Sequence, residues 1–288
     1  MSYWIVTDSG TDLPAEYMQK QKDLTVLPMM YQVGGEFTAP DGTDESTRAF
    51  YAKLRSGAVA TTAQVNVEDW KQIFEAHLSA GREILCITFS SALSGTYQAA
   101  ETAKDEVAAA YPHGKLIVID SKCASLGQGL LVHYALKMRD SGASLEETAQ
   151  WVRDNLLNVC HWFTVDDLQF LRRGGRVSAA SAYLGGIMKI KPVLHVDNEG
   201  RLIPMVKVQG RRRSLRELFD KVKETAFEPE KQTIFISHGD CLEEAQWLAS
   251  VLKEELHVKD VMIGFIGPVI GSHSGPGTMA IFFMGSPR

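Results

Sequence analysis

The sequence predicts an α/β protein with two domains, and two patterns carry this prediction. In the first half, short runs of β-branched and apolar residues alternate with longer amphipathic runs, which is typical of βα units around a mostly parallel sheet. In the second half, two strand-like runs flank Asn198-Glu199-Gly200, and such a turn favours an antiparallel hairpin. We therefore expect an N-terminal α/β domain over residues 1–158, and a C-terminal α/β domain with a mixed or antiparallel sheet over residues 159–288.

The first half contains alternating strands and helices. Runs dominated by Val, Ile, Leu and Thr predict strands at 4–8, 83–89 and 115–120. Apolar residues recur with a helical period in three longer segments, at 67–81, 96–111 and 126–142. Because parallel strands require long crossover connections, we expect these helices to flank a mostly parallel sheet.

The second half is richer in strands. The expected strands cover residues 191–197, 201–208, 234–238, 261–267 and 278–285, and the expected helices cover 214–225 and 242–256. No internal repeat or long linker interrupts the chain. The two domains are therefore expected to pack closely.

The charge balance argues against one class of partner. The 288 residues include 30 Lys and Arg against 35 Asp and Glu, which gives a net charge of -5. A negative chain has no general attraction for phosphate backbones or anionic membranes, so we do not expect nucleic acid as a partner.

The expected compartment follows from the cysteines and from hydropathy. The four cysteines lie far apart without a C-x-x-C pair, as free thiols do in a reducing compartment. The N-terminal MSYWIVTDSG has no basic segment, and no run reaches 18 apolar residues. We expect a cytoplasmic protein without stable membrane insertion.

Hydroxyl side chains gather where the strand at 83–89 leads into the helix at 96–111. Ser94-Gly95-Thr96 lies at this junction, where a helix N-terminus offers free backbone N–H groups to an anion. The Ser94 hydroxyl and these amides are suited to a carboxylate or a phosphate. Helix capping explains the same residues without any ligand, and the stretch alone favours capping.

Two further segments add polar groups to this picture. Thr61-Thr62-Ala63-Gln64 precedes the helix at 67–81, and His273 lies in the glycine-rich run 266–277, which we expect to be a loop. A lone histidine is usually structural, so His273 needs a partner to indicate a site.

These residues carry a resemblance to a known family. The segments IVTDSGTDLP, TTAQ, SSALSGTYQ, VIDSK, DDLQFLRRGGRVS, IKPVL and IGPVIGSHSGPG occur in the order in which they occur in the DegV family. Each segment is weak by itself, but their number and order are specific. The chain resembles DegV proteins, which are bacterial fatty-acid-binding proteins, over about residues 3–285.

The resemblance implies a function and a set of site residues. It implies a DegV-like two-domain fold that binds a long-chain fatty acid. The carboxylate would lie at Thr62, in a loop of the first domain, and at Ser94, with His273 nearby. Gly95 and Thr96 would support the carboxylate through their backbone. It further implies a lipid-binding carrier, and not an enzyme, that presents the carboxylate to a separate ATP-dependent fatty acid kinase. The fatty acid is then the ligand, and no cofactor or metal is implied.

An enzyme is the main alternative. A serine hydrolase or phosphotransferase would use Ser94 and His273, but the chain has no G-x-S-x-G elbow and no identifiable acid to orient the histidine. No phosphate-binding G-x-x-x-x-G-K loop or zinc-ligand spacing occurs either. In a carrier, we expect His273 to orient the Ser94 hydroxyl by one hydrogen bond.

Two assignments have both a structural and a functional interpretation. The segment Arg172-Arg173-Gly174-Gly175-Arg176 is typical of a helix C-terminus, but Arg176 could instead contact an acyl-phosphate or a partner protein. Apolar residues of 183–194 and 261–270 could line a tunnel for the acyl chain, although most are expected to be core.

Overall fold

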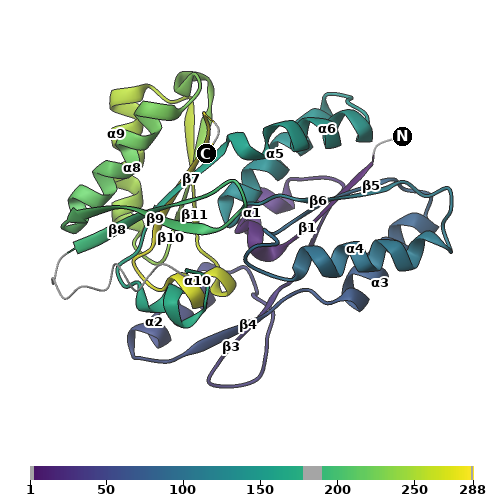
Figure 1. Ribbon diagram of the computed structural model, residues 1–288, viewed down its shortest axis with the longest axis horizontal. Helices are drawn as coiled ribbons and strands as arrows, with labels where there is room; N and C mark the ends of the chain where they lie inside the picture. The colour runs from purple at the N-terminus through teal and green to yellow at the C-terminus, as the bar shows by residue number, and fades with distance from the viewer. Residues whose placement is uncertain (1–2, 178–189, 287) are drawn as a thin grey trace.

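Two β-sheets organise the chain (Figure 1). The computed structural model describes residues 3–177, 190–286 and 288. The first sheet has the order β2-β1-β5-β6. All three of its pairings are parallel. Its strands are β1 (Trp4–Asp8), β2 (Leu24–Leu27), β5 (Ile84–Thr88) and β6 (Leu116–Asp120).

Both faces of the first sheet are covered by helices, and this explains why β5 is apolar throughout. Ile84 and Cys86 face the cluster formed with α3 (Val67–Ser79) and α4 (Thr96–Ala108). Leu85 and Ile87 face the cluster formed with α5 (Leu126–Asp140) and α6 (Leu145–Asn155). Successive side chains of a strand point to opposite faces, so a sheet covered twice needs a continuous apolar run. The short helix α1 (Ala15–Gln19) follows β1.

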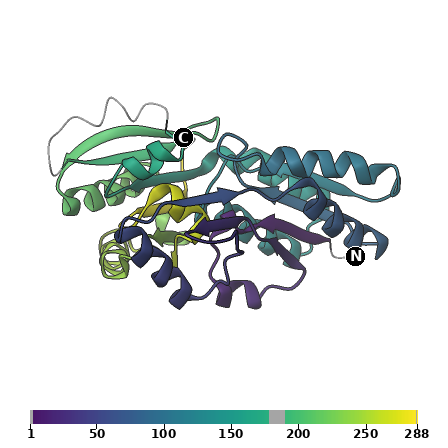
Figure 2. The ribbon, with the colours of Figure 1, turned by 90° about the horizontal axis from the view of Figure 1, so that it is seen from below.

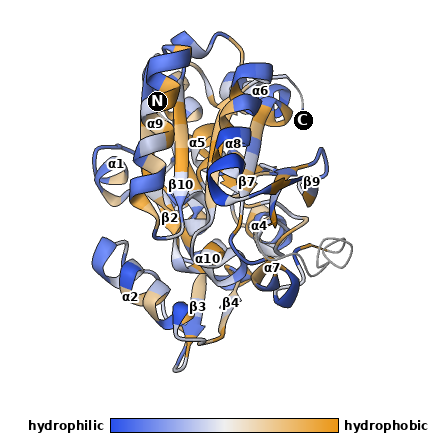
Figure 3. Cartoon of the chain, turned by 90° about the vertical axis from the view of Figure 1, so that its left-hand side faces the viewer, coloured by the Kyte–Doolittle hydropathy of each residue, from blue (hydrophilic) through white to orange (hydrophobic). Residues whose placement is uncertain are grey.

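The second sheet is mixed, with the order β11-β10-β12-β7-β8-β9. Only β10 and β11 are parallel, and the other pairings are antiparallel. Its strands are β7 (Val159–Thr164), β8 (Ile190–Val196), β9 (Leu202–Gln209), β10 (Thr233–His238), β11 (Asp260–Phe265) and β12 (Met279–Met284). The helices α8 (Arg211–Thr225) and α9 (Leu242–Leu256) pack on this sheet, and α8 turns a hydrophilic face outward (Figure 3).

Helix α5 joins the two halves, because it contacts strands of both sheets. One core cluster contains Leu85 and Ile87 of the first sheet together with Phe235 and Phe282 of the second. The halves therefore share a hydrophobic core. The division at residues 158 and 159 stays a prediction.

A third group of elements connects the halves on another side. It consists of α2 (Asp44–Arg55), the hairpin of β3 (Met30–Val33) and β4 (Ala60–Ala63), α7 (Gln169–Arg173), and α10 (Pro268–Ser274). The α10 helix comes late in the chain but contacts α2, β3, β4 and α7 (Figure 2). None of the helices in the described ranges is long and apolar enough to cross a bilayer.

The α/β fold class and the mixed second sheet are confirmed, and two local expectations are wrong. Thr62 and His273, both expected in loops, lie in β4 and α10. Sequence patterns missed α10 because Gly271 interrupts it and glycine disfavours a helix interior. In the fold Gly271 is needed, since a methyl group there would come within 3 Å of Phe50 and Tyr51 of α2.

Candidate functional site

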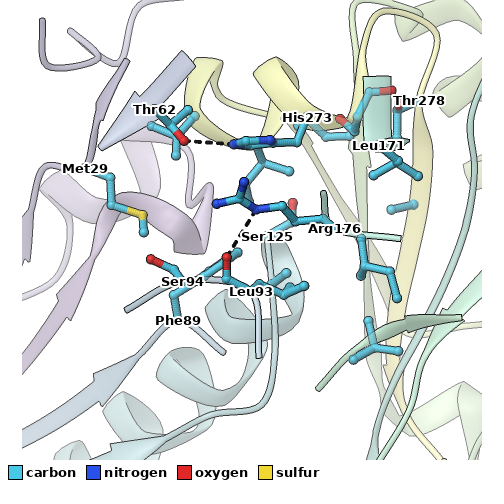
Figure 4. Close-up of a pocket in the computed structure, with 18 of the residues that line it drawn as sticks. Met29, Thr62, Phe89, Leu93, Ser94, Ser125, Leu171, Arg176, His273 and Thr278 are labelled. Carbon is cyan, nitrogen blue, oxygen red and sulfur yellow. Dashed lines mark hydrogen bonds between the residues drawn. The ribbon is translucent and has the colours of Figure 1, made fainter. Parts of the chain in front are cut away.

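A cavity of about 210 Å³ lies between the two halves (Figure 4). A single water needs only roughly 10–15 Å³ on this scale, so the cavity has room for a larger ligand. Most of its wall is apolar, with contributions from Phe163, Leu171, Val196, Leu202, Ile266 and Phe282. Met29, Phe89 and Leu93 of the first half also belong to the wall, so the cavity exists only when the two halves are packed together.

One part of the cavity wall is polar. Thr62 of β4, Ser94 before α4, Arg176 after α7 and His273 of α10 gather there (Figure 4). Four separate segments thus bring two hydroxyls, an imidazole and a guanidinium together. A site with a few convergent polar groups on an apolar cavity is typical of a small-molecule site.

His273 is held as a neutral imidazole. Its Nε2 lies 2.8 Å from Thr62 Oγ1, in a hydrogen bond. Its Nδ1 is buried, has no hydrogen-bond partner among the described residues, and faces Gly174, where any side chain would collide with it. Burial, and secondly the charge of Arg176, lower the pKa of His273 to about 4. His273 was expected to form a hydrogen bond with Ser94, but in the structure its hydrogen-bond partner is Thr62.

Ser94 is part of the N-terminal turn of α4. Its Oγ lies 2.9 Å from Thr96 Oγ1 and accepts a hydrogen bond from the Thr96 amide at 3.3 Å. The first amides of a helix have no partner within the helix, so those of α4 that Ser94 does not cap can donate to an anion. Gly95 lets the side-chain amide of Gln64 lie against this turn, since a methyl group on it would displace that amide.

Arg176 brings the positive charge. Its Nε donates to the carbonyl of Leu93 at 3.3 Å, and its Nη1 donates to the carbonyl of Gly174. Within the described ranges, no carboxylate forms an ion pair with this half-buried guanidinium. A buried cation without an opposite charge is costly, and an anionic ligand would supply the missing charge.

The comparisons with known proteins match nearly the whole chain. Residues 2–286 match the model of the DegV family, which is described as a family of uncharacterised proteins. A DegV domain-containing protein of Clostridium perfringens is 42% identical over 285 residues, which is 99% of this chain and 98% of that protein. The chain belongs to the DegV family.

Solved DegV structures share the fold. A DegV lipid-binding protein of Thermotoga maritima has a TM-score of 0.87 and 30% identity, and the match covers 100% of both chains. A DegV protein of Thermus thermophilus, described for its fatty acid binding, has a TM-score of 0.87 and 28% identity over 99% of this chain and 100% of that chain. Members of the DegV family thus bind lipids in this fold.

In this DegV protein, most of the predicted site residues come together. Thr62, Ser94, Gly95, Arg176 and His273 all line the cavity. Thr96 does not belong to the wall, because it is buried under Ser94 as its hydrogen-bond partner. Their roles toward a ligand stay predictions.

The sequence reasoning missed several residues of the wall. Gln64, Ser125 and His161 add polar groups, and Leu202 of the β8–β9 hairpin adds an apolar one. Gln64 belongs to the TTAQ segment, so its position two residues after Thr62 in the sequence could have indicated it. Of the segments predicted to line a tunnel, 261–270 contributes three wall residues, namely Ile266, Val269 and Ile270. Residues 183–189 of the other segment lie outside the described residues.

The neutral state of His273 can be measured directly. We expect its ring proton resonances to stay constant from pH 8 to about pH 5.5 and to titrate with a midpoint near 4. The resonances are assigned by their loss in His273→Gln. Because the folded pKa lies below the value of about 6.5 in the unfolded chain, this histidine's contribution to stability is present above pH 6.5 and is lost as pH falls through 4. A midpoint above 6 would show that the ring is hydrated or ion-paired.

Proposed function

We propose that this DegV protein binds one long-chain fatty acid, with its chain in the cavity and its carboxylate at Thr62, Ser94 and Arg176. The observation that carries the proposal is the apolar cavity whose polar end holds an arginine without a carboxylate partner among the described residues. The lipid-binding relative of Thermotoga maritima and the fatty-acid-binding relative of Thermus thermophilus support it, since both have the same fold at a TM-score of 0.87.

The two parts of such a ligand would be held by different interactions. The carboxylate would accept hydrogen bonds from the hydroxyls and from the first amides of α4, and these bonds are charge-assisted. The acyl chain would gain about 0.8 kcal/mol for each methylene moved from water into the apolar wall. Affinity therefore comes mainly from the chain, and orientation from the carboxylate.

We further propose that the protein presents the carboxylate to a separate ATP-dependent kinase in the cytoplasm. A carboxylate oxygen would attack the γ-phosphorus of ATP, with release of ADP, and the acyl-phosphate would remain on the carrier. Arg176 would pair with this phosphate, because a guanidinium can bind two phosphate oxygens at once. The sequence has no phosphate-binding loop of its own, which supports a division of labour between two proteins.

The geometry disfavours the hydrolase. A nucleophilic serine needs a histidine within hydrogen-bond reach and an acid on the other ring nitrogen. Here the Ser94 hydroxyl forms a hydrogen bond with Thr96, and His273 forms one with Thr62. We expect a fluorophosphonate probe to leave the lipid-free protein unlabelled. Stoichiometric labelling of Ser94 that disappears in His273→Ala would establish the enzyme instead.

Native mass spectrometry tests the carrier most directly. The protein is delipidated, then mixed with palmitate, stearate or oleate at equal molar amounts. We expect one fatty acid per chain, and weaker retention of the corresponding methyl esters, which lack the negative charge. If the protein bound none of the three acids while its circular dichroism spectrum showed an intact fold, the proposed function would be refuted.

A further inference from the structure

Asp12 connects three elements that surround the cavity. It follows β1 and the short 3-10 helix η1 (Ser9–Thr11), and its backbone has a positive φ of 50°. One carboxylate oxygen, Oδ1, accepts a hydrogen bond of 2.9 Å from the Gly267 amide. The other, Oδ2, accepts a hydrogen bond of 2.6 Å from the Ser125 hydroxyl. A single side chain thus contacts both halves of the protein.

Both partners of Asp12 stand at the start of a helix. Gly267 is the residue before α10, and Ser125 is the residue before α5. Ser125 also lies 3.0 Å from Ser237 Oγ of β10, so the connection extends into the second sheet. Because a helix is a rigid rod, the position of its first residue sets where its later residues lie.

The α10 helix carries the groups that Asp12 would align. Val269, Ile270 and His273 belong to α10 and line the cavity. A second side chain anchors the start of this helix, since Tyr51 of α2 donates a hydrogen bond of 2.7 Å to the carbonyl of Ile266, whose own amide donates to the His238 carbonyl at 2.8 Å. Asp12 and Tyr51 therefore hold the same peptide group, which joins Ile266 to Gly267, one through its N–H and the other through its C=O.

We infer that Asp12 is a positioning residue that fixes α10 against α5, so that His273 reaches Thr62 and the polar end of the cavity is assembled. The expected effect of Asp12 on palmitate affinity rests on the proposed fatty acid site. The expected effect of Asp12 on His273 is independent of that site. Asp12 touches none of the residues proposed to bind the carboxylate, and acts through Gly267 and Ser125.

The protonation of Asp12 makes asparagine a suitable mimic. Burial raises the pKa of Asp12 to about 7, and the charge of Asp8 raises it as well, while the bonds from Ser125 and Gly267 lower it. The neutral acid is therefore well populated at neutral pH. Asparagine can accept from the Gly267 amide, donate to the Ser125 hydroxyl, and adopt a positive φ.

The experiment compares Asp12→Gly with Asp12→Asn. Glycine tolerates the positive φ, so the first variant removes the carboxylate without adding backbone strain. We expect Asp12→Gly to lower the affinity for palmitate about tenfold or more, and to shift the His273 titration midpoint from about 4 toward the value of an exposed histidine. Asp12→Asn should restore palmitate affinity to within about threefold and return the midpoint to about 4.

A matched control separates positioning from general destabilisation. Leu248→Ala removes a buried side chain between α9 and the second sheet, in a core cluster that includes neither α5 nor α10. It should lower the melting temperature without changing the His273 titration or the palmitate affinity. Should Asp12→Gly fail to fold, Tyr51→Phe removes the other anchor of α10 and should shift the midpoint in the same direction.

Two results would overturn the inference. One is an unchanged His273 midpoint and unchanged palmitate affinity in Asp12→Gly. The other is an equal shift of the His273 midpoint and an equal loss of palmitate affinity in Leu248→Ala at matched stability. This result would show that Asp12 acts only as a general stabiliser of the fold. If the wild-type protein bound no fatty acid, the proposed function would fail, and the His273 midpoint in the ligand-free protein would still decide the role of Asp12.

Discussion

Replacement of Arg176 by alanine should slow kinase-coupled formation of acyl-phosphate about a hundredfold to a thousandfold, which is the usual effect of removing one donor that stabilises developing charge. The loss in palmitate affinity should be much smaller, about tenfold at most, because the hydroxyls of Thr62 and Ser94 and the amides of α4 would still bind the carboxylate. Arg176 donates to the carbonyls of Leu93 and Gly174, so the variant also loses two local contacts.

This prediction can be tested without a kinase. Hexadecyl phosphate has a doubly charged head group on the same type of chain, so it should depend on Arg176 more strongly than palmitate does. The ratio of the two affinities, measured by calorimetry, should change about tenfold or more in Arg176→Ala. Arg173→Ala is the matched control, since its guanidinium stacks 4.7 Å from the ring centre of Phe170. Equal losses for both ligands would contradict a preference of Arg176 for the phosphate.

The double variant Thr62→Val and Ser94→Ala should lower palmitate affinity about a hundredfold or more. Each hydroxyl would give the carboxylate a charge-assisted hydrogen bond, worth about 1.5–3 kcal/mol. If both bind one carboxylate, their effects should also be coupled, so that the double loss differs from the sum of the single losses.

The control for this variant is Thr61→Val. Thr61 is the neighbour of Thr62 in β4, but its hydroxyl donates to Gln32 at 3.2 Å and the residue is exposed. It should bind palmitate like the wild-type protein, and all variants should keep the wild-type circular dichroism spectrum. Wild-type affinity in both single variants and in the double variant would exclude a shared carboxylate site.

The parts of the site that the sequence could predict are local. Ser94 and Gly95 stand at a junction of strand and helix, and such junctions can be located from hydrophobic periodicity and from turn residues. The pairing of Thr62 with His273 joins positions 211 residues apart, on a four-residue strand and a seven-residue helix. Elements of this length are stabilised by their neighbours and have little periodicity of their own.

Arg176 shows a different limit. The segment before it has the basic residues and glycines of a helix end, and α7 does end at Arg173. No pattern in the sequence indicates whether Arg176, after the end of α7, points toward the cavity or toward solvent. Its place on the cavity wall depends on the packing of α7 against α10, which is a contact between distant segments.

The central position of β12 has a consequence for synthesis on the ribosome. This strand, Met279–Met284, lies between β10 and β7, although both are made before it. Until residues 279–284 emerge, β7 and β10 would each lack one of their two partner strands. Part of the apolar surface of α5 that packs on the second sheet would also stay exposed. Unpaired edges and exposed apolar surface favour association, so we expect the nascent chain to need chaperones until β12 has emerged from the ribosome.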